Sequence, residues 1–189
     1  GLDRGDDPDA LPPGAADDAG EDAGDDDGEP DEPDVPCRTA GRTATRLLTA
    51  VEYENSVRRL LGVDTEVRSS LPIDETVSDL FVHNATAELD EGKARKYMLI
   101  AEQLVDEITV PDLLSCDPGD TTDAQHACAE QFVRELGRRA YRRPLSEDEV
   151  ARWLGVYEIA REDEAIGYGF NGAVKTVISG MLQAPGFLM

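Results

Sequence analysis

Arginines gather in the stretch RRAYRRPLSEDEV, residues 138–150, which holds four arginines within six positions and then turns acidic. Such a cluster is typical of a nucleic-acid contact, of a site for an anion or acidic partner, or of ion pairs along a helix. Glu130 precedes Arg134 by four residues and Glu135 precedes Arg139 by four, the favourable order for helical ion pairs. Spacing by four also places three candidate contact residues on one helical face: Arg134, Arg138 and Arg142.

The charge of the rest of the chain favours ion pairing over nucleic-acid binding. Beyond residue 36 the chain carries 26 acidic against 17 basic residues, a net charge of -9. Nucleic-acid binding needs a basic footprint on the domain, so we expect no nucleic-acid partner. An acidic protein or a glycan remains the alternative contact for the arginines.

Three cysteines and two histidines are the candidates for disulfide or metal chemistry. Cys116 lies in a Pro/Asp/Gly loop and Cys128 lies twelve residues later in an expected helix, so a disulfide between them would hold that loop on the helix. Two unpaired thiols are the alternative. Cys37 is left over, which indicates a partner outside this chain or a free thiol.

Neither a metal nor a cofactor is expected in this segment. The step from His126 to Cys128 matches no common zinc spacing, and residues two apart face different sides of a helix. The chain contains no Cys-x-x-Cys-His run, the usual attachment motif for c-type haem. The acidic run at residues 25–34 does not fit an EF-hand loop, because Ala23 falls where the first calcium ligand should be.

Catalytic signatures are also missing from the sequence. It contains no Gly-x-Ser-x-Gly nucleophile motif and no glycine-rich phosphate loop. Carboxylates are abundant but follow surface-like patterns. We therefore assign no catalytic residue, and whether the chain forms part of an enzyme is open at this point.

The N-terminal segment differs in composition from the rest of the 189 residues. Residues 1–36 hold fifteen acidic residues against one basic residue, six of the eleven prolines and no aromatic residue. Such a segment cannot bury enough apolar surface to offset chain entropy, which predicts a disordered acidic tether over about residues 1–40. No apolar run of 18 residues exists, so no transmembrane segment is expected. An acidic tether and a disulfide favour an exported protein at the periplasm, the cell surface or outside the cell.

Two capping boxes mark where helices begin. Thr49 with Glu52, and Ser146 with Glu149, place a hydroxyl and a carboxylate three residues apart, so that each satisfies a backbone N–H of the other. Gly62 ends the first of these helices. The matching stretches RLLTAVEY and RPLSEDEV indicate either a faint internal repeat or chance recurrence of good capping chemistry.

Apolar residues at helical spacing predict further helices over about residues 92–108, 122–142 and 167–183. Pro144 ends the second of these with a break at Arg143–Pro144. The last is apolar nearly all round, which is typical of a central helix. We predict an all-α fold, a small bundle of about five helices, with one helical domain over 41–115 and a second over 116–189.

Residues 63–90 show no sustained period and predict an ordered, irregular loop. Four apolar residues of this loop are expected to pack against the helices: Leu71, Ile73, Leu80 and Phe81.

The stretch RLLTAVEYENSVRRLLGVD resembles the opening of a planctomycete-specific domain of unknown function. Glu52, Tyr53 and Asn55 match its pattern, as does the Leu-Leu-Gly ending at residues 60–62, whereas Arg59 replaces its Asp. The later FVHNATAEL is similar to the same domain, although His83 departs from its Asn. FVRELGRRAYRRPLSEDEV, together with MLQAPGFLM, resembles a second domain of this group.

These two resemblances cover about residues 46–189. They imply a large exported protein of the kind found in planctomycetes and myxobacteria, in which such domains are associated with c-type cytochrome modules. They also imply that further domains follow the Phe-Leu ending. No activity is established for the group, so it contributes no catalytic residue.

Two functions are consistent with the sequence. The first is a non-catalytic helical scaffold or interaction module at the N-terminal end of a larger exported protein, with the C-terminal domains of the same polypeptide as its partners. The second is a part of an exported haem-dependent oxidoreductase or polymer-degrading enzyme, whose active centre and haem lie in those C-terminal domains.

Overall fold

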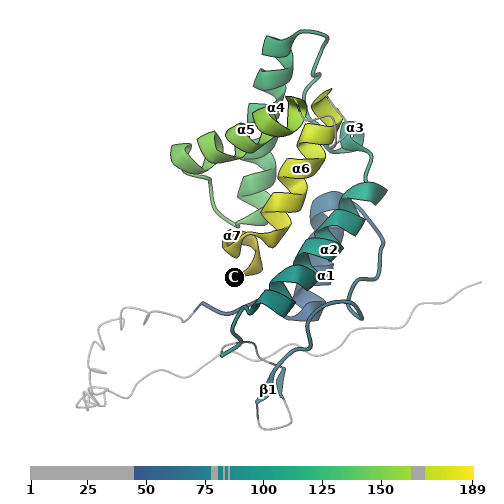
Figure 1. Ribbon diagram of the computed structural model, residues 1–189, viewed down its shortest axis with the longest axis vertical. Coiled ribbons are helices and arrows are strands. Elements are labelled where there is room, and N and C mark those ends of the chain that lie inside the picture. Colours follow the sequence, from purple (N-terminus) through teal and green to yellow (C-terminus); the bar gives the residue numbers. More distant parts are fainter. Residues whose placement is uncertain (1–44, 78–80, 83, 85, 163–168) are drawn as a thin grey trace, which may run out of the picture. The chain divides into compact units, whose positions relative to one another are not determined.

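A computed structural model describes residues 45–77, 81–82, 84, 86–162 and 169–189 (Figure 1). The expected tether over 1–40 and Cys37 lie outside these residues. These described residues form one compact unit, and the proposed division into domains at 115/116 stays a prediction. No helix among the described residues has the length and apolar character needed to cross a membrane.

The predicted all-α class is confirmed. Five long helices occupy the expected places, and they are α1 (Ala50–Leu61), α2 (Glu91–Glu107), α4 (Thr122–Ala140), α5 (Glu147–Glu162) and α6 (Gly169–Gln183). Two four-residue helices, α3 (Val110–Leu113) and α7 (Pro185–Leu188), escaped prediction because a single turn has no hydrophobic period to recognise.

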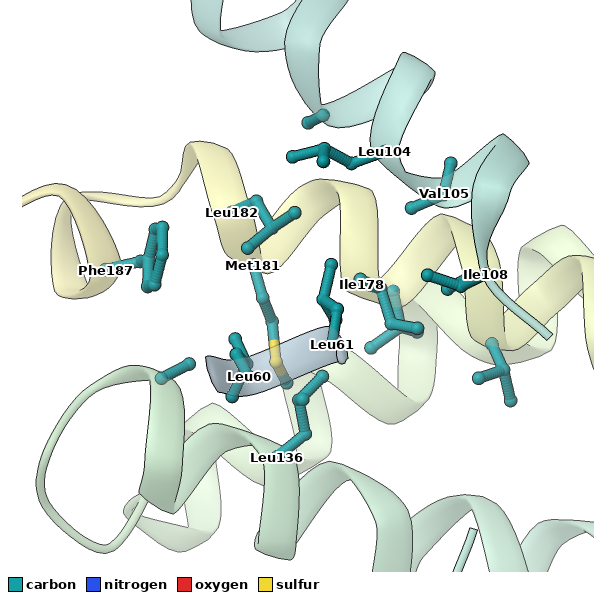
Figure 2. Close-up of a cluster of buried hydrophobic side chains, with 14 of the residues drawn as sticks. Leu60, Leu61, Leu104, Val105, Ile108, Leu136, Ile178, Met181, Leu182 and Phe187 are labelled. Atoms are coloured by element: carbon teal, nitrogen blue, oxygen red, sulfur yellow. The ribbon is translucent and has the colours of Figure 1, made fainter. Parts of the chain in front are cut away.

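Helix α6 is the centre of the hydrophobic core. It packs against α2, α4 and α5 along its length and against α3 and α7 (Figure 1). Figure 2 shows Ile178, Met181 and Leu182 of this helix pointing toward side chains from α1, α2 and α4. All three are fully buried, and a side chain of this size stabilises the fold by about 1.5–3 kcal/mol when it leaves water.

The loop after α1 differs from the prediction in two respects. It contains a short antiparallel hairpin, β1 (Thr76–Val77) and β2 (Phe81–Val82), with Thr76 opposite Val82. Leu71 packs into the core as expected, with 4% of its surface exposed, but Ile73 is 90% exposed and the prediction for it was wrong. Leu80 and the side chain of Phe81 lie outside the described part.

Helix α4 ends earlier than Pro144 alone would require. The helix stops at Ala140, Tyr141 caps it, and Arg142 takes a left-handed backbone conformation with φ 58°. This is the sole non-glycine residue with positive φ in the described ranges. The chain therefore turns at Arg142, one residue before the predicted break at Arg143–Pro144, and α5 begins after Ser146.

Candidate functional site

The start of α1 is held by a capping box that an arginine completes. The Thr49 N–H donates to Glu52 Oε2 at 2.8 Å, and the Glu52 N–H donates to Thr49 Oγ1 at 3.3 Å. Arg46 donates to both carboxylate oxygens of Glu52, from Nη1 at 2.7 Å and from Nη2 at 2.6 Å. The carboxylate thus joins the guanidinium to the first turn of the helix.

The start of α5 repeats this arrangement. The Ser146 N–H donates to Glu149 Oε2 at 2.8 Å, and the Glu149 N–H donates to Ser146 Oγ at 3.3 Å. Arg143 donates to both oxygens of Glu149, at 2.7 and 2.6 Å. The arginine stands three residues before the cap in both places, so the likeness of the two sequence stretches extends to their local structure.

Both glutamates are kept ionised by these contacts. The bidentate hydrogen bonds from Arg46 lower the pKa of Glu52 from 4.5 to about 2, and the Thr49 N–H acts in the same direction against partial burial. The hydrogen bonds from Arg143 and the Ser146 N–H lower the pKa of Glu149 to about 2 as well. A carboxylate with so low a pKa is a poor proton donor or acceptor near neutral pH, which fits a structural role for both residues.

A buried amide connects the start of α1 to the hairpin region. Asn84, 5% exposed, donates from Nδ2 to the Leu48 carbonyl at 3.0 Å and to Asp74 Oδ1 at 2.8 Å, and its Oδ1 accepts from the Glu75 N–H at 2.9 Å. Asp74 in turn accepts from the Ala50 N–H at 3.0 Å. No local pattern indicates these contacts, because the partners lie up to 36 residues apart.

A buried carboxylate fixes the segment that follows α1. Glu54 is 3% exposed and accepts hydrogen bonds from the N–H groups of Val67 and Arg68, at 3.1 and 2.9 Å, and from Arg68 Nη2 at 3.1 Å. Burial raises the pKa of Glu54, but the Arg68 and Val67 donors and the charges of Arg68 and Arg58 outweigh burial and lower it. The carboxylate therefore stays charged and paired, and it holds residues 67–68 against α1.

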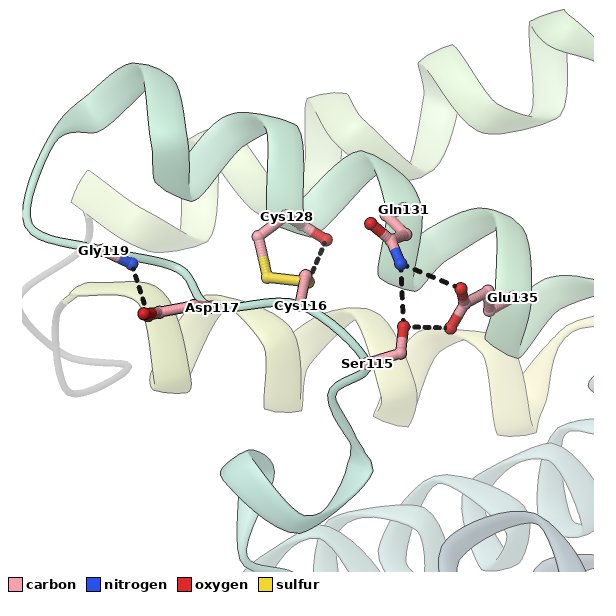
Figure 3. The surroundings of a disulfide bond; sticks show 7 residues. All are labelled: Ser115, Cys116, Asp117, Gly119, Cys128, Gln131 and Glu135. Atoms are coloured by element: carbon pink, nitrogen blue, oxygen red, sulfur yellow. Dashed lines mark hydrogen bonds between the residues drawn. A yellow bond between two sulfur atoms is a disulfide. The ribbon is translucent and has the colours of Figure 1, made fainter.

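The structure contains the expected disulfide between Cys116 and Cys128, whose Cα atoms are 5.6 Å apart (Figure 3). Beside it, Ser115 Oγ donates to Glu135 at 2.6 Å, and Gln131 Nε2 donates to both Ser115 Oγ and Glu135. The loop before α4 is thus fastened to that helix at two successive turns.

The three arginines of the predicted stripe do not converge on one site. Arg134 binds two carboxylates, Glu130 on its own helix and Glu147 at the start of α5, with donor–acceptor distances of 2.7–3.0 Å. Arg138 is exposed and forms no ion pair or hydrogen bond with a described residue. Arg142 donates to the Phe187 carbonyl at 3.2 Å, which ties it to α7.

The expected ion pair between Glu135 and Arg139 is absent, and both residues use other partners. Arg139 Nη2 donates to the carbonyls of Arg59 and Leu60, at 2.7 and 3.1 Å, at the C-terminal end of α1. Carbonyls there lack helical partners and form the negative end of the helix dipole, which attracts a cation. The structure therefore brings together Arg59, Arg139 and Arg142, a set that the spacing within α4 could not indicate. They border a hollow of about 170 Å³.

A second surface feature is a groove of about 660 Å³ that runs over α6 between α2 and α5. Val105, Trp153 and Val156 supply its apolar part, whereas Thr176, Ser179 and Gly180 of α6 are among its small residues. Trp153 lies directly over Gly180, where an added Cβ would come within 2.8 Å of the indole ring. Glycine at this position lets the indole approach the helix backbone.

His126 and Cys128, considered as metal ligands in the sequence, separate in the structure. The His126 imidazole lies 3.6 Å from a carboxylate oxygen of Glu158, and Cys128 is in the disulfide. Within the described ranges, no group of three or more His, Cys, Asp or Glu side chains has a geometry that could hold a metal ion.

Comparison with known families identifies two regions in this chain. Residues 46–110 match PSD3, described as a protein of unknown function (DUF1587), and residues 128–189 match PSD5, described as a protein of unknown function (DUF1595). No curated protein and no solved structure matched the chain. The two arginine-completed capping boxes fall one in each region.

Proposed function

We propose that this chain is a non-catalytic helical scaffold or interaction module at the N-terminal end of a larger exported protein. The observation that carries the proposal is the groove over α6, which offers a partly apolar surface on the central helix. Its occupant is another domain of the same polypeptide, the partner that the resemblance of residues 46–189 implies.

The use of the polar side chains supports a structural role. Glu52, Glu54, Asn84 and Glu149 are the residues with the most distinctive polar environments, and each holds one segment of the chain against another. The disulfide between Cys116 and Cys128 supports export, because such bonds persist in oxidising compartments. The association with c-type cytochrome modules remains part of the proposal and rests on the resemblance alone.

Hydrogen exchange tests the groove. Amides of residues 172–183 should exchange more slowly in the full-length polypeptide than in the 189-residue chain, because a docked domain covers them. Thr176→Arg fills the groove and should abolish this difference. Ala151→Arg adds the same charge to an exposed position of α5 that does not line the groove, and it should leave the difference unchanged.

Equal exchange in the two proteins would overturn the docking proposal. Soret absorption by the full-length polypeptide would show a haem in the remaining domains and favour the alternative of an exported haem-dependent enzyme.

A further inference from the structure

Three arginines from two helices and a turn face one surface hollow. Arg59 belongs to α1, Arg139 to the last turn of α4, and Arg142 to the turn that follows. We propose that this hollow binds an organic oxyanion, with its phosphate or carboxylate against the guanidinium groups and its carbon part on the apolar floor. The site is independent of the groove over α6.

The charge of the lining residues is the first reason to expect an anion in this hollow. None of the residues that line the hollow is acidic, although the chain as a whole has a formal net charge of -23. Nearby acidic residues in the sequence are engaged elsewhere, since Glu54 accepts from Val67 and Arg68 and Glu135 accepts from Ser115 and Gln131. Among the described residues, Arg59, Arg139 and Arg142 form no ion pair, so an anion from outside would meet no competing carboxylate on the wall.

The second reason to expect an anion is that the arginines keep unused N–H donors. A guanidinium carries five N–H donors in a planar fork. Arg139 directs Nη2 to two backbone carbonyls and Arg142 directs Nη2 to one, which anchors each side chain and leaves its other N–H groups available. Ser56 also borders the hollow and can add a hydroxyl donor. Anchored guanidinium groups lose less side-chain entropy when a ligand binds.

The floor of the hollow indicates an anion with a carbon part. Leu60, Ala140 and Phe187 line it, and all three are buried core residues. Arg142 has a left-handed backbone and donates to the Phe187 carbonyl beside this floor, and such strained residues cluster at binding sites. An aromatic or aliphatic phosphate or carboxylate therefore fits this surface better than a bare inorganic ion.

A neighbouring hollow of about 420 Å³ shares Arg59 and Arg139 but differs in charge. Glu107 and Asp112 line it, so its carboxylates would repel an anion. Only the smaller hollow contains Arg142 and Ser56, which is why we place the oxyanion there.

The test uses the 189-residue chain and phenyl phosphate as the probe, with inorganic phosphate and phenol as its two halves. In NMR titrations at fixed ionic strength, phenyl phosphate should shift the amides of Ser56, Arg59 and Arg139 saturably. Inorganic phosphate should bind more weakly, and phenol should leave these amides unchanged. Arg59→Gln should weaken phenyl phosphate binding by about tenfold, the loss expected for one charge-assisted hydrogen bond.

Two further variants separate a site from general charge. Arg142→Asn removes a second guanidinium but keeps a residue that tolerates the left-handed backbone, and it should weaken binding by a similar factor. Arg138→Gln makes the same charge change as Arg59→Gln at an exposed neighbour that does not line the hollow, and its effect should stay within about twofold. Equal loss in Arg138→Gln, unsaturable shifts, or equal binding of phenol would each overturn the proposal.

Discussion

Single residues control where the two capped helices begin. At both starts a carboxylate accepts from a backbone N–H and from an arginine three residues before the cap. Charge-assisted bidentate pairs of this kind are stronger and more directional than neutral hydrogen bonds. Side chains within seven consecutive residues therefore hold the entry into α1 and into α5, and at α1 the distant contacts of Asp74 and Asn84 add to them.

The pKa of Glu149 makes this contribution dependent on pH. Its value falls from 4.5 to about 2 in the folded protein, so the pairing with Arg143 stabilises the fold above about pH 4.5 and this stabilisation is lost as the pH falls toward 2. We expect Glu149→Gln to lower the urea midpoint of unfolding at pH 7 and to leave it nearly unchanged at pH 2.

The control is Glu162→Gln, which removes an exposed acidic residue at the far end of α5. Its midpoint should follow the wild type at both pH values. A deficit in Glu149→Gln that is equally large at pH 7 and pH 2 would contradict the assigned role of the ion pair.

Roles at the residue scale could be predicted where the partners are close in the sequence. Ser146 and Glu149 are three residues apart, so their spacing alone indicates the capping geometry. Arg139 was assigned to Glu135 by the same helical rule, but its partners are carbonyls 79 and 80 residues away. A rule for pairs on one helix cannot rank a tertiary partner, and nothing in the sequence around Asn84 reports its burial.

At the scale of elements, the disulfide holds the loop that precedes α4 on that helix. It joins Cys116 to the second turn of the helix and closes a loop over a separation of twelve residues. In the chain-entropy account, closing a loop of this length stabilises the folded state by about 3 kcal/mol. The polar contacts of Ser115 with Glu135 and Gln131 hold the same loop on the next turns of the helix.

We expect the double variant Cys116→Ser/Cys128→Ala to unfold with a free energy lower by about 3 kcal/mol, measured by urea denaturation. Alanine is chosen at 128 because that position is buried and a hydroxyl there would lack a partner. Reduced wild-type protein is the matched control and should unfold at nearly the same urea concentration as the variant. Full retention of wild-type stability by the double variant would mean that the loop is held by its polar contacts alone.

Helices with an apolar pattern sustained over several turns could be predicted from the sequence. Loop residues and helix ends that depend on tertiary contacts could not. The apolar pattern of α6 predicted a central helix, and the structure places it at the core. Ile73 was expected to be buried because it is apolar, yet loop residues follow no period that shows which side faces the core. The early end of α4 coincides with the left-handed backbone of Arg142 and its hydrogen bond to Phe187, a partner 45 residues away that the local sequence does not indicate.

At the scale of the whole molecule, α7 packs against α1 and the residue before its cap. Phe187 is 2% exposed and meets Tyr53 of α1 edge-on, with ring centroids 5.4 Å apart. The Leu48 N–H donates to the Leu188 carbonyl at 2.7 Å. Segments matched to the two families thus share one hydrophobic core.

Phe187→Ala should therefore reduce the stability of the packing at both ends of the described chain. We expect a loss of about 3–5 kcal/mol in unfolding free energy, the usual range for removal of a buried phenylalanine. Hydrogen exchange should report equal loss of protection in α1 and in α6, the helix that packs against α7. Met189→Ala, at a half-exposed neighbour, should change stability by less than about 0.5 kcal/mol. Loss of protection confined to α7 would show that the helix is an appendage and not a closing element.

The hydrogen bond between Leu48 and Leu188 has a mechanical consequence. Leu48 lies where the described chain first joins the core, and Leu188 lies near its last residue. The hydrogen bond therefore places the two ends of the described chain side by side. Force applied between the two ends of the described chain would load this contact and the Tyr53–Phe187 pair first, before it reached the helices packed around α6. We expect such a unit to open first at α7, by separation of Leu188 from Leu48, while the helices around α6 remain packed.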